Sequence, residues 1–120
     1  MALTGSCHCG AVRIAVPSAP EWVASCNCSF CRKIGSLVAY YPDDGSVRIE
    51  GETVPYIWGD EMISQHHCPK CGAFTDWRST GESYGKVGVN ARLLDGFAMR
   101  DGLYSMDGNE LEVRYFDNAD

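Results

Sequence analysis

The sequence predicts an all-β domain built of small antiparallel sheets. Its 120 residues are enough for one domain with a modest core, and its apolar and charged contents are ordinary for a globular protein. Apolar and polar residues alternate in short segments, with Gly, Pro, Asp and Asn between them. There is no internal repeat, low-complexity tract or obvious linker. Residues 1–120 are therefore expected to form a single domain.

The expected strands and helices are all short. Residues 62–67 and 73–78 flank the last cysteine pair and are expected to be the arms of a hairpin. Only residues 29–35 and 91–99 have helical character, and neither segment is long. Asp-Gly occurs twice within residues 98–110, which indicates turns and a late hairpin. The other expected strands are "AVRIAV" (11–16), "LVAYY" (37–41), "SVRIE" (46–50), "TVPYIW" (53–58), "KVGVNA" (86–91) and "ELEVRYF" (110–116).

The net charge of −6 argues against non-specific binding to nucleic acid or to an anionic membrane. Residues 1–42 differ from the rest, because they carry one acid, Glu21, against Arg13, Arg32 and Lys33. This basic stretch contains the first cysteines, and it would suit thiolates or an anionic ligand as well as a solvated surface. The predicted partners are small molecules rather than nucleic acid or membrane.

The cysteines indicate metal binding in a reducing compartment. The first residues lack the basic start and apolar core of a secretory signal peptide, and no segment is long enough to span a membrane. We therefore expect a cytoplasmic protein, in which clustered cysteines act as metal ligands rather than as disulfides. The odd number of cysteines, seven, also fits poorly with a framework made only of disulfides.

Cys68 and Cys71 form the most specific motif, "CPKCG". In such a zinc knuckle the proline starts the turn, the glycine lets the backbone double back, and N–H groups can donate to the sulfurs. A knuckle supplies two ligands, so it needs a second pair. Cys7 and Cys9, also followed by glycine, are the natural partners, and four thiolates would make a closed structural zinc site.

Cys26, Cys28 and Cys31 remain, and no further cysteine can complete their set. Three protein ligands with one open position are typical of catalytic zinc. The fourth position could be taken by water, by a substrate thiol or by a histidine. The histidines available are His8, His66 and His67, of which the last two alternate on an expected strand. A disulfide within the triple is a further alternative that would abolish metal binding there.

The motifs "GSCHCGAVRIAV", "CNCSFCRK", "HCPKCGAFTDW" and "VGVNARLLDG" resemble the glutathione-dependent formaldehyde-activating enzyme family, which includes centromere protein V. The resemblance covers nearly the whole chain and implies a β-tent, a set of small sheets stapled by zinc. It also implies two zinc ions per chain. The first CxC and the knuckle would hold the structural zinc, and the CxCxxC motif would hold a second zinc where glutathione or substrate binds.

Two residues depart from the family pattern at the second site. Asn27 stands where the family usually has histidine, and Phe30 stands where it often has an acid. The expected metal ligands are unaffected, but the surroundings of the open position differ from those in the family.

The activity implied by the resemblance is that of a carbon–sulfur lyase or synthase acting on an adduct such as S-hydroxymethylglutathione. A thiol at the open position would lose its proton and add to the carbonyl of formaldehyde. Arg32 and Lys33 are candidates for holding the carboxylates of glutathione, the possible co-substrate, as are Arg78 and Lys86. The aromatic residues that could line the pocket are Tyr40, Tyr41, Trp58 and Trp77.

The alternative function is that of a non-catalytic zinc module that binds a protein partner, which predicts a blocked or empty triple and an exposed apolar patch.

A methionine sulfoxide reductase of related fold is excluded, because that reaction needs a nucleophilic cysteine late in the chain and none follows Cys71. Serine-hydrolase, phosphate-loop and dinucleotide motifs are absent from the sequence.

Overall fold

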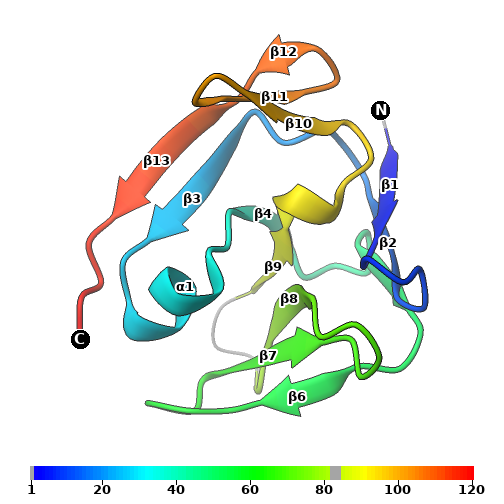
Figure 1. The fold of residues 1–120 in the computed structure, drawn as a ribbon. Coiled ribbons are helices and arrows are strands. Elements are labelled where there is room, and N and C mark those ends of the chain that lie inside the picture. The colour runs from blue at the N-terminus through cyan, green and yellow to red at the C-terminus, as the bar shows by residue number, and fades with distance from the viewer. Residues whose placement is uncertain (1, 82–84) are drawn as a thin grey trace.

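The computed structural model describes residues 2–81 and 85–120 and confirms the all-β fold class (Figure 1). One short helix, α1 (Ser29–Ile34), and one 3₁₀ turn, η1 (Ala91–Leu93), interrupt the strands. No helix in these two ranges is long and apolar enough to cross a membrane. The first small sheet contains β1 (Leu3–Ser6), β2 (Arg13–Val16) and β5 (Arg48–Glu50), and the second contains β10 (Phe97–Arg100), β11 (Leu103–Met106) and β12 (Asn109–Glu110).

The third sheet is larger than expected. It has seven strands in the order β13-β3-β4-β9-β8-β7-β6, and its pairs are antiparallel except for β13 and β3, which run parallel. The C-terminal strand thus lies at the edge of the sheet beside β3, a position that places the chain end next to α1 (Figure 1). The strands of this sheet are β3 (Trp22–Cys26), β4 (Val38–Pro42), β6 (Val54–Tyr56), β7 (Ile63–His67), β8 (Phe74–Ser79), β9 (Lys86–Asn90) and β13 (Glu112–Phe116).

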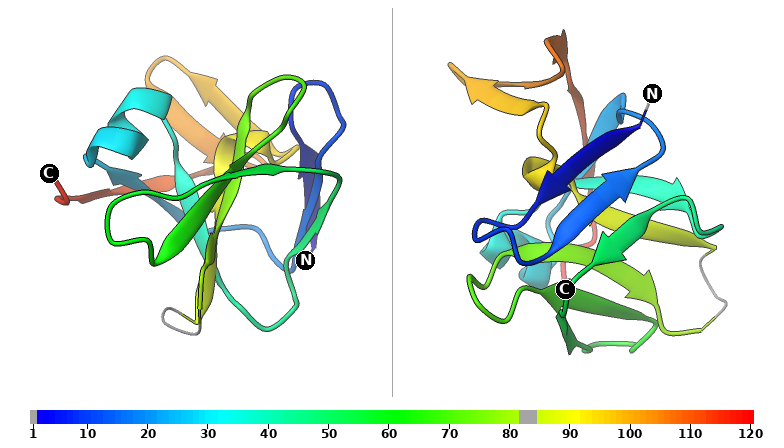
Figure 2. Two further views of the ribbon diagram at one scale, coloured as in Figure 1. Left: turned by 90° about the horizontal axis from the view of Figure 1, so that it is seen from below. Right: turned by 90° about the vertical axis from the view of Figure 1, so that its right-hand side faces the viewer.

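One apolar core joins the three sheets, whose arrangement is shown in Figures 1 and 2. Alternation along β4 shows how it is built, because Ala39 and Tyr41 enter the core while Tyr40 points to the other face of the sheet. The same core receives Ile14 from β2 and Met106 from β11. Burial of these side chains fixes the small sheets against the large one.

The two Asp-Gly pairs form the expected late turns. Asp101 and Gly102 have φ of 52° and 78°, and Asp107 and Gly108 have φ of 51° and 81°. Positive φ at both central residues is the signature of a type I′ turn, which matches the twist of antiparallel strands. The outcome is two successive hairpins, β10–β11 and β11–β12.

Residues 91–99 do not form the helix considered for them. Only the single turn η1 forms, and the chain then enters β10 at Phe97. Asp95 and Gly96 intervene, and the Gly96 carbonyl accepts a hydrogen bond from Asp107 N at 3.0 Å, so the segment is held as part of a hairpin. Strands β1 and β3 were not expected, because "LTGS" is polar and "WVASC" lacks clear alternation.

The expected β7–β8 hairpin forms and contains an ion pair between a buried aspartate and a half-exposed arginine. The register shifts between His66 and His67, which is the mark of a bulge before the knuckle turn. On β8, the Asp76 side chain is fully buried and accepts a hydrogen bond from Arg78 Nε at 2.6 Å and another from Thr75 Oγ1 at 2.7 Å. The knuckle turn thus lies at the end of a hairpin whose buried Asp76 is held by hydrogen bonds from Thr75 and Arg78.

Replacing Arg78 by alanine is expected to lower the free energy of unfolding by about 2–3 kcal/mol, because the Asp76 carboxylate would remain buried without its cation. Arg114 is the matched control, since it forms an Arg–carboxylate pair of the same i, i+2 spacing with Glu112 at 2.7 Å in an exposed position. Arg114→Ala should cost about 1 kcal/mol or less. Urea unfolding in reducing buffer measures both changes, and equal losses would contradict the assigned role of Asp76.

Candidate metal centres

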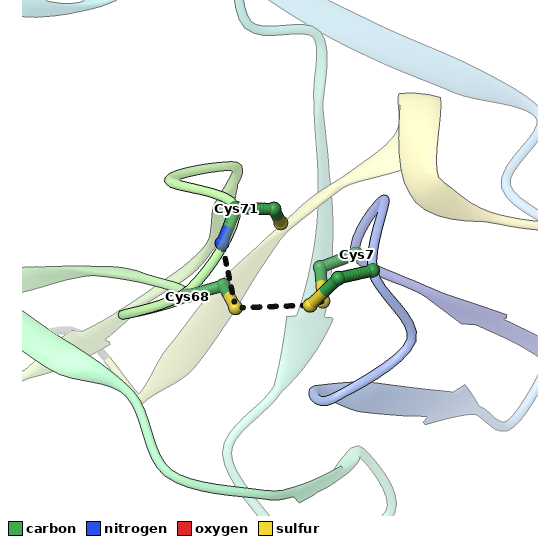
Figure 3. Close-up of side chains that lie close together, drawn as sticks. Cys7, Cys68 and Cys71 are labelled. Carbon is green, nitrogen blue, oxygen red and sulfur yellow. Dashed lines mark hydrogen bonds between the residues drawn. The ribbon is translucent and has the colours of Figure 1, made fainter.

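The first cysteine cluster forms where two turns meet. Cys7 and Cys9 lie in the turn between β1 and β2, and Cys68 and Cys71 lie in the turn between β7 and β8. The four sulfurs all lie within 4.8 Å of one another, with Cys9 3.6 Å from Cys68 across a sequence separation of 59 residues. A tetrahedral zinc with Zn–S bonds of about 2.3 Å separates its sulfurs by about 3.8 Å. The cluster therefore fits a closed tetrahedral ion (Figure 3).

Backbone N–H groups surround these sulfurs as they do in a thiolate site. Val12 N donates to Cys7 Sγ at 3.2 Å, and Lys70 N donates to Cys68 Sγ at 3.3 Å. Gly72 N donates to Cys68 O at 3.0 Å, and the φ of 78° at Gly72 turns the chain back after the knuckle. Hydrogen bonds from backbone N–H groups, that of Ala73 foremost, lower the pKa of the Cys71 thiol to about 6. At Cys9 a backbone hydrogen bond from Ala11 lowers the thiol pKa, but burial and the neighbouring sulfurs outweigh it and raise that pKa to about 11. The turns thus favour ionisation of Cys71, and a cation is needed for all four thiols to ionise together.

The second cluster gathers at the start of α1. Cys26 ends β3, Cys28 caps the helix and Cys31 lies in its first turn, and their sulfurs are all within 4.8 Å of one another. Cys28 N donates to Cys26 Sγ and Cys31 N donates to Cys28 Sγ, each at 3.4 Å. Burial foremost, together with the neighbouring cysteines, raises the pKa of the Cys31 thiol to about 12. Three thiolates can share this space only when a cation neutralises them, so the cluster fits a metal with three protein ligands.

The histidines do not complete the second cluster in the described part of the chain. His8 is exposed in the first cysteine turn, and His67 lies on β7. His66 is buried with both ring nitrogens occupied, Nδ1 by Thr53 Oγ1 at 2.8 Å and Nε2 by Ser64 Oγ at 2.9 Å. Burial, with a smaller contribution from the charge of Arg78, lowers the pKa of His66, so the ring stays neutral within this network. Among the described residues, the group of ligating atoms there holds three cysteines alone.

An aromatic surface adjoins the second cluster on the outer face of the seven-stranded sheet. The Tyr40 ring lies 5.8 Å from Trp22, 5.9 Å from Trp77 and 6.2 Å from Phe116, measured between ring centroids. Burial foremost, together with the charges of Cys26, Cys31 and Cys28, raises the pKa of Tyr40 to about 12. The phenol therefore remains protonated at neutral pH. Phe116, which packs against Tyr40, is the register partner of Cys26, and this pairing brings the aromatic surface to the cluster. Trp22 and Phe116 had no motif to distinguish them in the sequence.

The other aromatic candidates lie elsewhere. Tyr41 faces the core, and its hydroxyl donates to Ser18 O at 2.8 Å. Trp58 donates to Gln65 Oε1 at 2.7 Å and packs on Phe30 at a centroid distance of 6.4 Å. Phe30, the residue that departs from the family pattern, thus belongs to a separate aromatic group on the far side of α1.

The candidate cations differ in their availability. Lys86 Nζ lies over the Tyr40 ring, 4.7 Å from its centroid, and Arg32 and Lys33 are exposed in the last turn of α1. Arg78, in contrast, is held by Asp76. Arg114 was missed by the sequence reasoning, although its guanidinium lies 4.2 Å from the Trp22 ring centroid. Lys86 thus places positive charge on the aromatic surface, whereas Arg114 is also paired with Glu112.

A family model and a solved structure each match this chain. The model of the glutathione-dependent formaldehyde-activating enzyme family matches residues 2–104. The fold is similar to the crystal structure of a protein from Rhodobacter sphaeroides, with a TM-score of 0.73 and 28% sequence identity. That alignment covers 95% of this chain and 100% of the bacterial one. The matched range includes all seven cysteines.

The two clusters predict two zinc ions per chain in protein purified without oxygen. The ion held by three cysteines should be lost first to a chelator, because it has fewer protein ligands. Replacing Cys26, Cys28 and Cys31 together by serine should lower the zinc content by one and leave a folded domain. Elemental analysis with a colorimetric chelator measures both quantities. Finding at most one zinc in the anaerobic wild-type protein would contradict an open second site.

Loss of a knuckle ligand should be far more damaging than loss of a ligand at the second cluster. A structural zinc contributes on the order of 10 kcal/mol to the folding of small zinc domains. Cys71→Ser should therefore unfold or aggregate the protein, whereas Cys28→Ser should lower the melting temperature only slightly. Thermal unfolding followed by circular dichroism makes the comparison. A Cys71→Ser variant as stable as the wild type would show that the first cluster does not staple the fold.

Proposed function

This chain belongs to the glutathione-dependent formaldehyde-activating enzyme family, and we propose that it forms or cleaves the carbon–sulfur bond of a thiol–formaldehyde adduct such as S-hydroxymethylglutathione. The observation that supports this most is the second cluster, where three cysteine sulfurs gather beside an aromatic surface with no fourth ligand from the described residues. Such a set leaves room for the sulfur of an external thiol.

Zinc is the metal that suits both clusters. Four thiolates from Cys7, Cys9, Cys68 and Cys71 make a closed tetrahedral site, which is the form of structural zinc. Cys26, Cys28 and Cys31 would hold a second ion with a formal charge of −1 at the centre. A zinc ion in that position lowers the pKa of a thiol that binds it, so the thiolate is available at neutral pH.

The chain's own residues then act on the oxygen of the adduct. When a thiolate adds to formaldehyde, a carbon–sulfur bond forms, the carbonyl π bond breaks, and the oxygen becomes an alkoxide that takes up the proton released by the thiol. Tyr40 stays protonated beside the cluster and can donate a hydrogen bond to this oxygen as its charge develops. Its neighbours Trp22 and Phe116 exclude water from one side of the reacting group.

The carboxylates of glutathione would be held by cations near this surface. Lys86 and Arg114 lie over Tyr40 and Trp22, and the exposed Arg32 and Lys33 stand on α1. We also propose that residues 1–120 act as one zinc-binding domain in the cytoplasm, where thiols are kept reduced. The partners are then a small thiol and an aldehyde.

A non-catalytic zinc-binding interaction module is the second candidate, and one observation favours it. An apolar groove of about 570 Å³ runs between α1 and the edge strand β6, and Ile34 and Tyr56 are 42% and 52% exposed along it. The stacked rings of Phe30 and Tyr56, 6.0 Å apart, form one end. This patch is the feature that an interaction module requires, but it leaves the three-cysteine cluster without a role.

The thiol experiment separates the two candidates. In cobalt-substituted protein, glutathione should strengthen the thiolate-to-metal charge-transfer band and preserve the tetrahedral ligand-field spectrum, because a fourth sulfur enters the second site. Smaller thiols are tested next, followed by formaldehyde, with the S-hydroxymethyl adduct observed by magnetic resonance. The adduct also forms spontaneously, so only a rate above that of the enzyme-free control counts.

A variant of Tyr40 tests whether its hydroxyl group acts on the oxygen of the adduct. Tyr40→Phe should lower the rate of adduct formation on the order of 100-fold, within the range for loss of one donor to a developing oxyanion. Its cobalt spectrum with glutathione should match that of the wild type. Glutathione binding without acceleration would point to another thiol adduct as substrate. No spectral response to any thiol in metal-loaded protein would rule out the enzyme and favour the interaction module.

A further inference from the structure

The C-terminal segment contacts the second cysteine cluster although it lies beyond the family match, which ends at residue 104. The parallel pairing of β13 with β3 places Phe116 opposite Cys26, so the chain that follows β13 runs past the loop holding the cysteines (Figure 1). This proximity joins residues about 90 positions apart, as in the 92-residue separation between Asn118 and Cys26.

Asn118 donates from Nδ2 to the Sγ atom of Cys26 at 3.4 Å. The other N–H donors to sulfur in this cluster, those of Cys28 and Cys31, come from its own backbone. Asn118 thus supplies a side-chain donor from a distant part of the chain. We propose that Asn118 is a positioning residue for the second metal centre, orienting the Cys26 thiolate and withdrawing charge from its sulfur.

The surrounding hydrogen bonds hold Asn118 in place. Its backbone N–H donates to Asn27 Oδ1 at 2.6 Å, and Asn27 Nδ2 donates to Asp117 Oδ1 at 2.9 Å. Asn27 N also donates to Phe116 O at 3.2 Å. Asn27, which departs from the family pattern between the first two cysteines, is therefore the residue that anchors the segment. Asn27 thus holds the backbone of the segment, and the side chain of Asn118 hydrogen-bonds to Cys26.

Two further bonds secure the far end of the segment. The carboxylate of Asp120 accepts from Ser29 N at 2.8 Å and from Ser29 Oγ at 2.9 Å, next to the helix cap formed by Cys28. The segment thus spans the cysteine loop from Cys26 to the start of α1. Groups that hydrogen-bond to metal ligands orient those ligands and tune the metal, and their loss lowers metal affinity about 10–100-fold.

A donor on the sulfur has a spectroscopic consequence that a purely structural contact lacks. A hydrogen bond to a thiolate stabilises its lone pairs and raises the energy of charge transfer from sulfur to the metal. Removing the donor should move the charge-transfer band of cobalt-substituted protein to longer wavelength. It should also speed alkylation of the metal-bound sulfur by iodoacetamide, since the sulfur retains more charge.

The test compares Asn118→Ala and Asn118→Asp with the wild type in the full-length protein loaded with two cobalt ions. Both variants remove the side-chain donor and keep the backbone N–H that bonds Asn27. Asn109→Asp, at an exposed position in β12, is the control with the same change of charge. We expect a shift of the band to longer wavelength and loss of the second metal to a chelator on the order of 10-fold faster in both Asn118 variants. The Asn109 variant should show neither effect.

The inference rests on the proposed second metal site, and the experiment distinguishes failure of that site from failure of the role of Asn118. Wild-type protein that binds one metal would overturn the second site and this role of Asn118 together. Wild-type protein with two metals, combined with an unchanged band in both Asn118 variants, would overturn the role of Asn118 alone. Faster metal loss without a spectral shift would mean that the C-terminal segment only shields the cysteine loop and does not act on the Cys26 sulfur. This result would also contradict the proposal.

Discussion

The contact between two cysteine turns is the constraint on which the arrangement of the sheets depends. Cys7 and Cys9 lie in the β1–β2 turn of the first small sheet, whereas Cys68 and Cys71 lie in the β7–β8 turn of the seven-stranded sheet, and their sulfurs lie within 4.8 Å of one another. Few apolar side chains support this junction, since the buried residues there are Cys7, Val12 and Cys68 alone among the described residues. A four-thiolate ion bound there would supply the missing cohesion, because its binding free energy would add to the free energy of folding.

The second cluster depends on the first for its rigid setting. The knuckle hairpin carries Trp77, which contacts Tyr40 on β4, and Tyr40 in turn lies beside the three sulfurs. The opposite side of the cluster is built by β3 and β13, whose pairing brings Phe116 and Asn118 to Cys26. A site that uses three ligands from one short loop therefore still draws its surroundings from β13, β3, β4 and β8 of the seven-stranded sheet.

Spacing in the sequence predicts the two cysteine groups, because metal ligands in knuckles and CxCxxC turns are close along the chain. It also predicts the hairpins, where the chemistry of Asp-Gly and Cys-Pro turns is local. Strand β3 was missed, since its stability comes from β13 and β4 rather than from its own pattern. The contacts of Asn118 had no local signal, because they join residues about 90 positions apart. Tertiary pairing, rather than propensity, places those residues.

The central claim is that seven sulfurs divide into four around one zinc and three around another. A crystal of zinc-loaded protein measured on both sides of the zinc absorption edge tests this directly. The account predicts two anomalous peaks, one bonded at about 2.3 Å to the sulfurs of Cys7, Cys9, Cys68 and Cys71, and one bonded to those of Cys26, Cys28 and Cys31 with an exogenous fourth ligand. A single peak, or a second peak ligated by histidine, would contradict it.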